Sequence, residues 1–173
     1  MVHQQEIMDR MIDHNLLQIG SVLLKHKEWE VREQAATLVG NFATSKRARE
    51  LFHLAFPKLK ELLEDPVLEV REQIAMAFMK LSTTDDGCQR IVASSCAETM
   101  IHSFIRHSKD SSCLKREDGL YLIYLLEAFT NLTFNDYSIE PLLGKGAIVN
   151  FCNITSQKYV EEIMRENHCQ KIQ

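Results

Sequence analysis

Apolar residues recur at helical spacing in two stretches of the N-terminal half of the chain. In each stretch they stand at i, i+4, i+7, i+8 and i+11. This spacing gathers side chains on one face of an α-helix, whereas one face of a strand takes every second residue. The pattern therefore predicts two long amphipathic helices. Their apolar positions are Val31, Ala35, Leu38, Val39 and Phe42 in the first, and Val70, Ile74, Ala77, Phe78 and Leu81 in the second.

The two helical stretches are copies of one repeat. The pentapeptide Glu30–Gln34 recurs letter for letter as Glu69–Gln73, an offset of 39 residues. A third copy follows at an offset of 51, and its end, Asn131-Leu132-Thr133, matches the stretch that begins at Asn41. The additional residues fall in the polar segment 108–118, which we expect to be an inserted surface loop. A third long helix is predicted at 120–134.

Shorter helical segments separate the long helices. They are predicted at 47–54 and 56–64, at 89–93 and 98–107, and at 137–143 and 147–154. One short, one medium and one long helix give a unit of about 40 residues, which is the armadillo/HEAT period. The sequence predicts an all-α, right-handed superhelical solenoid in a single domain, 1–173, with four units at about 3–44, 46–83, 86–134 and 137–171.

Local signals at three helix starts add detail to this organisation. Asp65 can accept a backbone N–H as N-cap of the second long helix, and Pro66 suits its first helical position. Trp29 stands at the start of the first long helix, where we expect it to be packed. The basic group Lys46, Arg47 and Arg49 is expected to be a solvated helix start.

The repeat motifs resemble those of the armadillo-repeat family over nearly the whole chain. The resemblance rests on Asp65-Pro66 followed by Val70-Arg71, on the helix end Ala128–Thr133, and on Leu142–Ile148, which is similar to the junction between short and medium armadillo helices. It implies a superhelical scaffold that binds other proteins. Peptide-binding members carry an asparagine at the positions of Asn41 and Asn131, where it pairs with the main chain of an extended ligand.

Within that family the sequence resembles the radial spoke head 14 homologs of motile cilia. The residues that carry this resemblance are Val31-Arg32, Leu62–Pro66 and Gly87–Val92. These homologs are longer, so the chain would cover part of their length, and the 108–118 insertion departs from their pattern. The resemblance implies a structural subunit of the axonemal radial spoke, with other spoke or microtubule-associated proteins as partners and a location in the cilium or flagellum.

The faces of the long helices that the apolar positions leave free form a candidate partner-binding strip along the concave surface. We call these nine residues the ladder: Gln34, Thr37, Asn41, Gln73, Met76, Lys80, Tyr124, Glu127 and Asn131. Met76 and Tyr124 are the candidate anchors. The alternative is that partners bind the outer surface or the two ends of the array, at 3–14 and 158–171.

The ladder departs from the importin pattern. Lys80 replaces the middle asparagine, and Thr37, Met76 and Glu127 stand where nuclear-import adaptors carry tryptophan. Two interpretations of Asn41 and Asn131 are therefore open: they pair with a ligand backbone, or they bond locally within their own helices.

Composition narrows the function further. Hydrophobic residues make up 45% of the chain and charged residues 25%, which excludes disorder as the main state. The net charge of −4 argues against nucleic-acid binding by bulk charge. No signal peptide is expected, and the longest apolar run, 120–126, is too short for a membrane span. We expect a cytoplasmic protein whose five cysteines are reduced.

No motif predicts catalysis or a cofactor. The cysteines form no CxxC pair, and His102 and His107 lie on different helical faces, so no metal site is predicted. Gly144-Lys145-Gly146 lacks the phosphate-binding pattern, and no GxSxG is present. The sequence predicts a non-enzymatic protein-binding scaffold, with the radial spoke as its setting. The alternative is a soluble adaptor that binds an extended peptide in signalling or chaperone regulation.

Overall fold

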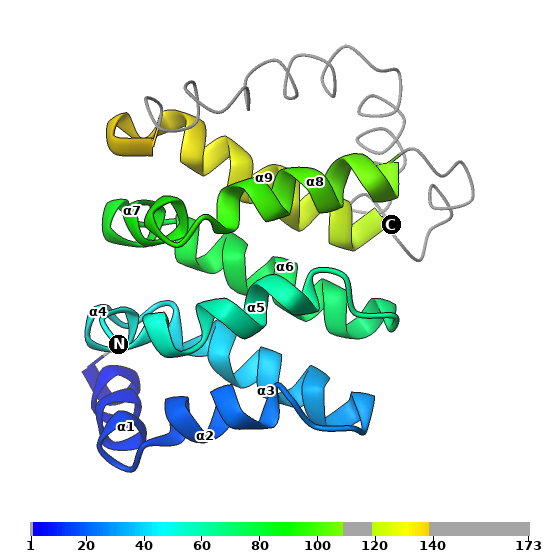
Figure 1. Ribbon diagram of the computed structural model, residues 1–173. Coiled ribbons are helices and arrows are strands. Elements are labelled where there is room, and N and C mark those ends of the chain that lie inside the picture. The colour runs from blue at the N-terminus through cyan, green and yellow to red at the C-terminus, as the bar shows by residue number, and fades with distance from the viewer. Residues whose placement is uncertain (1, 109–118, 139–173) are drawn as a thin grey trace, which may run out of the picture.

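The computed structural model describes residues 2–108 and 119–138, and helices run through most of that part of the chain (Figure 1). No strand occurs among these residues. In chain order the elements are α1 (Val2–Asp13), α2 (Leu16–Leu23), α3 (Trp29–Phe42), α4 (Lys46–Arg49), the 3₁₀ turn η1 (Phe52–Leu54), α5 (Phe56–Leu62), α6 (Leu68–Ser82), α7 (Asp85–Ala93), α8 (Cys96–Ser108) and α9 (Gly119–Phe134).

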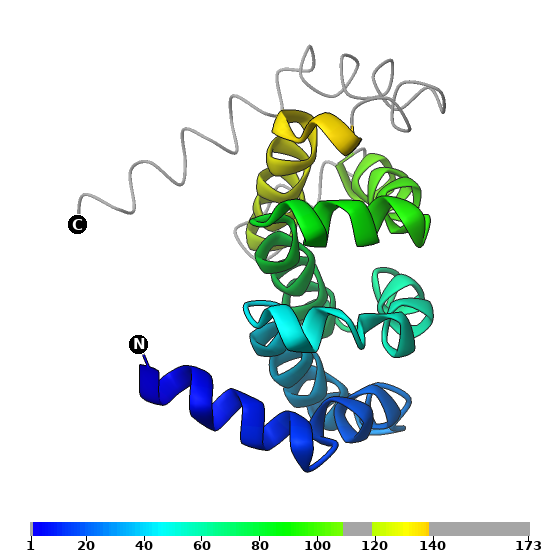
Figure 2. The same ribbon diagram turned by 90° about the vertical axis from the view of Figure 1, so that its left-hand side faces the viewer.

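The helices stack in two columns. The long helices α3, α6 and α9 lie side by side, and α6 packs against both of the others. The medium helices α2, α5 and α8 lie on the opposite side of the stack, while α1 projects past the column of long helices (Figure 2). This arrangement confirms the predicted all-α solenoid.

The core follows the predicted apolar positions. Val70, Ile74, Ala77, Phe78 and Leu81 of α6 are all buried, because α6 has a long helix on each side. In α3, Ala35, Val39 and Phe42 are buried, whereas Val31 and Leu38 are half-buried. The apolar residues of α9 also enter the core. Those that are buried are Tyr121, Leu122, Leu125, Ala128, Phe129 and Leu132.

A glycine sets the distance between α3 and α6. A Cβ atom added at Gly40 would lie 3.1 Å from the Cβ of Ala77 and 3.3 Å from its Cα. Such contacts are tighter than van der Waals packing allows without a shift of the neighbour. Gly40 and Ala77 therefore let the two helix backbones approach closely.

A buried ion pair joins two successive turns of the solenoid. Arg32 donates to both carboxylate oxygens of Asp65, with Nε–Oδ2 and Nη2–Oδ1 distances of 2.8 and 3.0 Å. The side chains are only 13% and 3% exposed. Nη1 of Arg32 also donates to the carbonyl oxygens of His26 and Lys27, at 3.0 Å each. One guanidinium thus holds the loop before its own helix and the loop before the next long helix. The bond to Asp65 raises the pKa of Arg32 above its ordinary value.

Arg71 repeats half of this arrangement. Its Nη1 donates to the carbonyl oxygens of Asp65 and Pro66, at 2.8 and 3.4 Å. These acceptors stand five and six residues before the arginine, as His26 and Lys27 do for Arg32. The guanidinium also lies over the ring of Tyr121, 5.7 Å from its centroid. In both copies of the pentapeptide, the arginine therefore holds the loop that precedes its helix by hydrogen bonds to the carbonyl oxygens of that loop.

Three expectations for individual residues were wrong. Asp65 and Pro66 do not begin α6: its N-cap is Val67, because the Asp65 carboxylate is engaged by Arg32 and by the backbone N–H of Val67. Trp29 is not packed but 36% exposed. In the basic group, Arg49 is buried rather than solvated, because it donates to Asp86 and to the carbonyl oxygen of Ala43.

The short and medium helices match their predicted ranges with shifted ends. The segment predicted at 47–54 divides into α4 and η1, and α7 begins at Asp85, four residues before the predicted start. Its N-cap, Thr84, accepts a hydrogen bond from the backbone N–H of Gly87. The 109–118 part of the predicted loop, the helices 139–143 and 147–154, and the motif 142–148 lie outside the described residues. The division into four units stays a prediction.

Replacing Phe78 tests the packing of α6 between its neighbours. Phe78 is fully buried, so Phe78→Ala is expected to lower the free energy of unfolding by about 3–5 kcal/mol. Urea unfolding followed by circular dichroism measures the change. Phe134→Ala is the matched control, because that ring is 83% exposed and its loss should change stability by less than about 0.5 kcal/mol. Equal midpoints for the two variants would contradict the helical register described above.

Replacing Asp65 tests the buried ion pair. Asp65→Ala leaves the Arg32 guanidinium buried without a carboxylate, so a loss of about 3 kcal/mol is expected in the free energy of unfolding. Asp13→Ala is the control, because Asp13 pairs with Arg47 at the surface, where both side chains are more than half exposed. This variant should unfold at the wild-type midpoint. A wild-type midpoint for Asp65→Ala would mean that the pair does not join the two turns.

Candidate functional site

All nine ladder residues lie on the three long helices that stand side by side. Gln34, Asn41 and Glu127 are exposed, and the other six are half-buried. The half-buried members are Thr37, Gln73, Met76, Lys80, Tyr124 and Asn131. The ladder is therefore a surface shared by α3, α6 and α9.

Polar contacts between adjacent helices connect the ladder. The Nζ of Lys80 donates to Oδ1 of Asn41, at 3.0 Å, and the Thr37 hydroxyl lies 3.0 Å from Oε1 of Gln73. Nδ2 of Asn131 donates to Oγ of Ser82, also at 3.0 Å. Lys80 and Asn41 occupy equivalent positions of successive repeats, so this bond joins one rung of the ladder to the next.

The structure contradicts one of the two interpretations of the asparagines, that they bond locally within their own helices. Neither bonds only within its own helix, because each contacts a side chain of α6. Donor and acceptor roles are fixed by the partners: Lys80 can only donate, so Asn41 presents its oxygen to it. The Ser82 hydroxyl proton goes to the carbonyl oxygen of Met79, at 2.8 Å, so Ser82 accepts from Asn131.

The side-chain amide of each asparagine uses only one of its two polar atoms in these contacts. Nδ2 of Asn41 and Oδ1 of Asn131 have no hydrogen-bond partner among the described residues. The ladder thus offers a donor on α3 and an acceptor on α9. An extended peptide backbone presents both complementary groups.

Carboxylates give the ladder face its charge. Glu30 and Glu69 stand one helical turn before Gln34 and Gln73, on the same face of α3 and α6. Together with Glu127 they are exposed, and none of the three forms an ion pair with a described residue. Glu30 and Glu69 are not among the predicted ladder residues, although both belong to the repeated pentapeptide. The i−4 spacing from the ladder glutamines was the signal for them.

The two cysteines of the described region are buried, which does not suit a nucleophile. Cys88 and Cys96 are buried free thiols. Burial raises the pKa of each to about 11; the nearby Asp85 carboxylate adds to the shift at Cys88. Nucleophilic cysteines need the opposite shift, because the thiolate is the reactive form. Cys113, Cys152 and Cys169 lie outside the described residues.

The described residues contain no group of three or more His, Cys, Asp or Glu side chains that could hold a metal ion. His102 lies with Nδ1 3.2 Å from the carbonyl oxygen of Glu98, and the ring of His107 packs edge-on against Tyr121. None of the described helices is long and apolar enough to span a membrane.

Known structures share this architecture. The chain is similar to a designed armadillo repeat protein in complex with the peptide (KR)4, with a TM-score of 0.70 and 18% identity over 92% of this chain and 66% of that one. A second designed armadillo repeat protein gives a TM-score of 0.69 and 17% identity, with the same coverage. An engineered protein gives 0.69 and 19%, over 93% of this chain and 64% of its own. The chain has an armadillo-like repeat fold.

The likeness is confined to architecture. This chain spans 61–66% of the length of these solved structures. No protein-family model matches the sequence, and no curated protein matches it. Identities of 17–20% show the fold alone.

Alkylation of the thiols tests the burial of Cys88 and Cys96. With iodoacetamide at pH 8 both are expected to stay unmodified in the folded protein, because a pKa of about 11 leaves only about 0.1% thiolate. In 6 M guanidinium chloride both should react within minutes. Peptide mass spectrometry identifies the modified cysteines. Rapid modification of either thiol in the folded protein would contradict the packing of α7 and α8.

Proposed function

We propose that this protein is a non-enzymatic scaffold that binds an extended, basic peptide of a partner protein along the ladder. The observation that carries the proposal is the conjunction, on one face of α3, α6 and α9, of amide groups and carboxylates that have no partner in the described part of the chain. The armadillo-like fold supports it, since solenoids use such strips as binding surfaces.

The two asparagines would hold the peptide backbone. Nδ2 of Asn41 can donate to a backbone carbonyl, and Oδ1 of Asn131 can accept from a backbone N–H. The Lys80–Asn41 bond fixes the amide of Asn41 before a ligand arrives, which lowers the entropy lost on binding. Lys80 thus acts as a positioning residue in place of a third asparagine.

Met76 and Tyr124 would anchor side chains of the peptide. Both are half-buried on the ladder, so each offers apolar area with a fixed base. A polarizable thioether and an aromatic ring are typical of the few residues that concentrate binding energy.

The three carboxylates favour basic ligand side chains. Glu30, Glu69 and Glu127 form no ion pair with a residue that the structure describes, and Lys80 is the single cation among the ladder residues. A basic peptide would gain ion pairs at these positions, whereas an acidic peptide would meet like charge. The designed armadillo repeat protein in complex with (KR)4 is a structural neighbour that carries such a ligand.

The sequence motifs suggest the cellular setting. The resemblance to the radial spoke head 14 homologs would place the scaffold in the axoneme, with spoke proteins as partners. The alternative setting is a soluble adaptor in signalling or chaperone regulation. Affinity isolation from ciliated and non-ciliated cells distinguishes the two: recovery of spoke proteins from ciliated cells supports the axoneme, and recovery of the same non-axonemal partner from both cell types supports the adaptor.

Charge reversal tests the ladder with one probe, a fluorescein-labelled peptide of alternating Lys and Arg. Glu69→Lys combined with Glu127→Lys is expected to weaken binding about tenfold or more, because the ligand is cationic. Tyr124→Ala should weaken binding without a change of charge. Fluorescence anisotropy measures the affinities.

The control for charge is Glu50→Lys, an exposed residue at the end of α4 and outside the ladder. It should leave the affinity unchanged at 150 mM salt, where the Debye length is about 8 Å. Circular dichroism verifies that each variant is folded. Equal affinity of the wild type and the Glu69→Lys/Glu127→Lys variant would refute binding at the ladder.

A further inference from the structure

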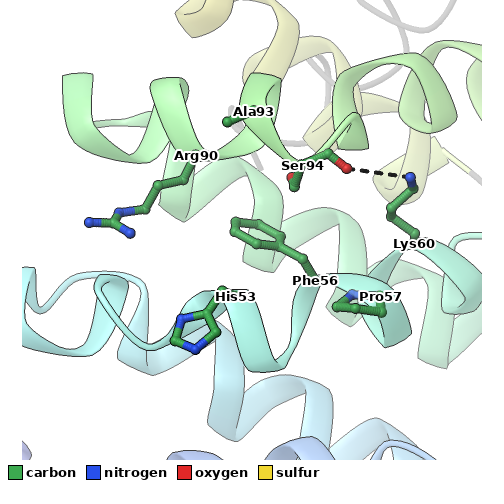
Figure 3. Close-up of a pocket in the computed structure, with 7 residues that line it drawn as sticks. All are labelled: His53, Phe56, Pro57, Lys60, Arg90, Ala93 and Ser94. Atoms are coloured by element: carbon green, nitrogen blue, oxygen red, sulfur yellow. Dashed lines mark hydrogen bonds between the residues drawn. The ribbon is translucent and has the colours of Figure 1, made fainter.

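A hollow opens on the side of the solenoid away from the ladder, between successive short and medium helices. Its volume is about 470 Å³, within the range of sites that hold small ligands or peptide side chains. η1 and α5 supply one wall, and α7 with the turn after it supplies the other (Figure 3). We call it the outer groove, and its lining residues are His53, Phe56, Pro57, Lys60, Arg90, Ala93 and Ser94.

The base of the outer groove is apolar. The Phe56 ring points from α5 toward α7 (Figure 3), and it is 5% exposed, so its position is fixed by packing. Its ring also lies 5.9 Å from that of Phe52. Pro57 and Ala93 add exposed apolar surface on the two walls. An apolar side chain placed here would bury area against a rigid base at little cost in protein rearrangement.

The rim of the outer groove is cationic. Lys60 forms no ion pair with a described residue, and its Nζ makes only a long hydrogen bond of 3.4 Å to the carbonyl oxygen of Ser94. Because an ammonium has three donors, Lys60 retains capacity for a carboxylate. None of the described residues that line the groove is acidic.

Arg90 adds to this charge because its carboxylate partner is shared. Asp86 accepts from Nε of Arg90, at 2.8 Å, and from Nε of Arg49, at 3.0 Å. Burial alone would raise the pKa of Asp86, but the hydrogen bonds from the two guanidiniums outweigh it and lower the pKa. One ionised carboxylate between two guanidiniums leaves one positive charge uncompensated at this end of the groove.

We propose that the outer groove is a second partner-binding site, for an acidic peptide segment that inserts an apolar side chain. The inserted side chain packs on Phe56 between Pro57 and Ala93, and flanking carboxylates pair with Lys60 and Arg90. The charge preference is opposite to that of the ladder. Two segments of different chemistry can therefore bind at the same time, on opposite sides of one stack.

The probe for the outer groove is a fluorescein-labelled peptide in which a Leu-Phe pair is flanked by two Asp on each side. Two variants of the groove act by different means. Lys60→Glu reverses the charge of the rim, and Ala93→Trp fills the hollow with no change of charge. Each is expected to weaken binding about tenfold or more in fluorescence anisotropy. Since Lys60 and Ala93 are not in the core, circular dichroism should be unchanged.

Matched controls separate the groove from general electrostatics. Lys46→Glu makes the same charge change at an exposed position of α4, outside the groove, and should leave the affinity unchanged. The ladder variant Glu69→Lys/Glu127→Lys should also bind the acidic peptide normally. A peptide with Ser-Ser in place of Leu-Phe should bind at least about tenfold more weakly, because it cannot fill the apolar base.

Nuclear magnetic resonance locates the bound peptide. Amide shift changes are expected at residues 53–60 and 90–94 and not along the ladder. The proposal is overturned if the Leu-Phe peptide does not bind below about 1 mM, if neither groove variant weakens it, or if the shifts map to the ladder. Because the probe and the variants differ from those used for the ladder, either site can fail while the other stands.

Discussion

The burial of α6 between α3 and α9 is the constraint on which the rest of the structure depends. An amphipathic helix can bury its apolar positions only against a neighbour, and in a solenoid that neighbour is the next repeat. All five apolar positions predicted for α6 are buried, whereas two of the five in α3 remain half-buried. Gly40 and Ala77 bring the backbones together, and the buried Arg32–Asp65 pair aligns the loops that enter the long helices.

This stacking also creates the ladder. Residues at equivalent repeat positions come to lie on adjacent helices, so a bond such as that from Lys80 to Asn41 connects side chains 39 positions apart. The polar contacts use only part of each amide, and the other part has no hydrogen-bond partner among the described residues. A surface whose hydrogen-bonding groups are half satisfied and already oriented suits an extended ligand, because little order is lost when it binds.

The sequence predicted the architecture because its determinants are periodic. Apolar spacing and the pentapeptide repeat are both local patterns that translate directly into helices and their order. The errors arose where a side chain acts over a distance. Asp65 resembled an N-cap because it stands with Pro66 just before the apolar pattern of α6, but its carboxylate is engaged by Arg32, 33 residues away. Arg49 resembled a solvated charge until Asp86, 37 residues away, was placed beside it.

In the candidate sites, too, features set by local patterns were predicted and features set by contacts between distant residues were not. The ladder residues could be selected from the sequence, because their spacing is that of the apolar positions shifted around the helix. The hydrogen bonds between ladder residues could not be predicted from the sequence. The presence of Lys80 at an asparagine position does not indicate whether the lysine contacts a ligand itself or positions a neighbouring asparagine. The outer groove has no periodic signal: Phe56 and Arg90 are 34 residues apart in separate repeats. It exists because η1 and α5 of one repeat lie next to α7 of the following repeat.

The charges of the two faces follow from where the repeat places its polar residues. Carboxylates gather on the ladder because the pentapeptide carries glutamate one turn before each ladder glutamine. On the outer side, Lys60 and Arg90 come from different helix types, and the carboxylate that pairs with Arg90, Asp86, also accepts from the buried Arg49. Arg49 is thus more than a structural residue: by engaging Asp86 it leaves the charge of Arg90 less compensated. The interior of the stack thereby sets the electrostatics of its outer surface.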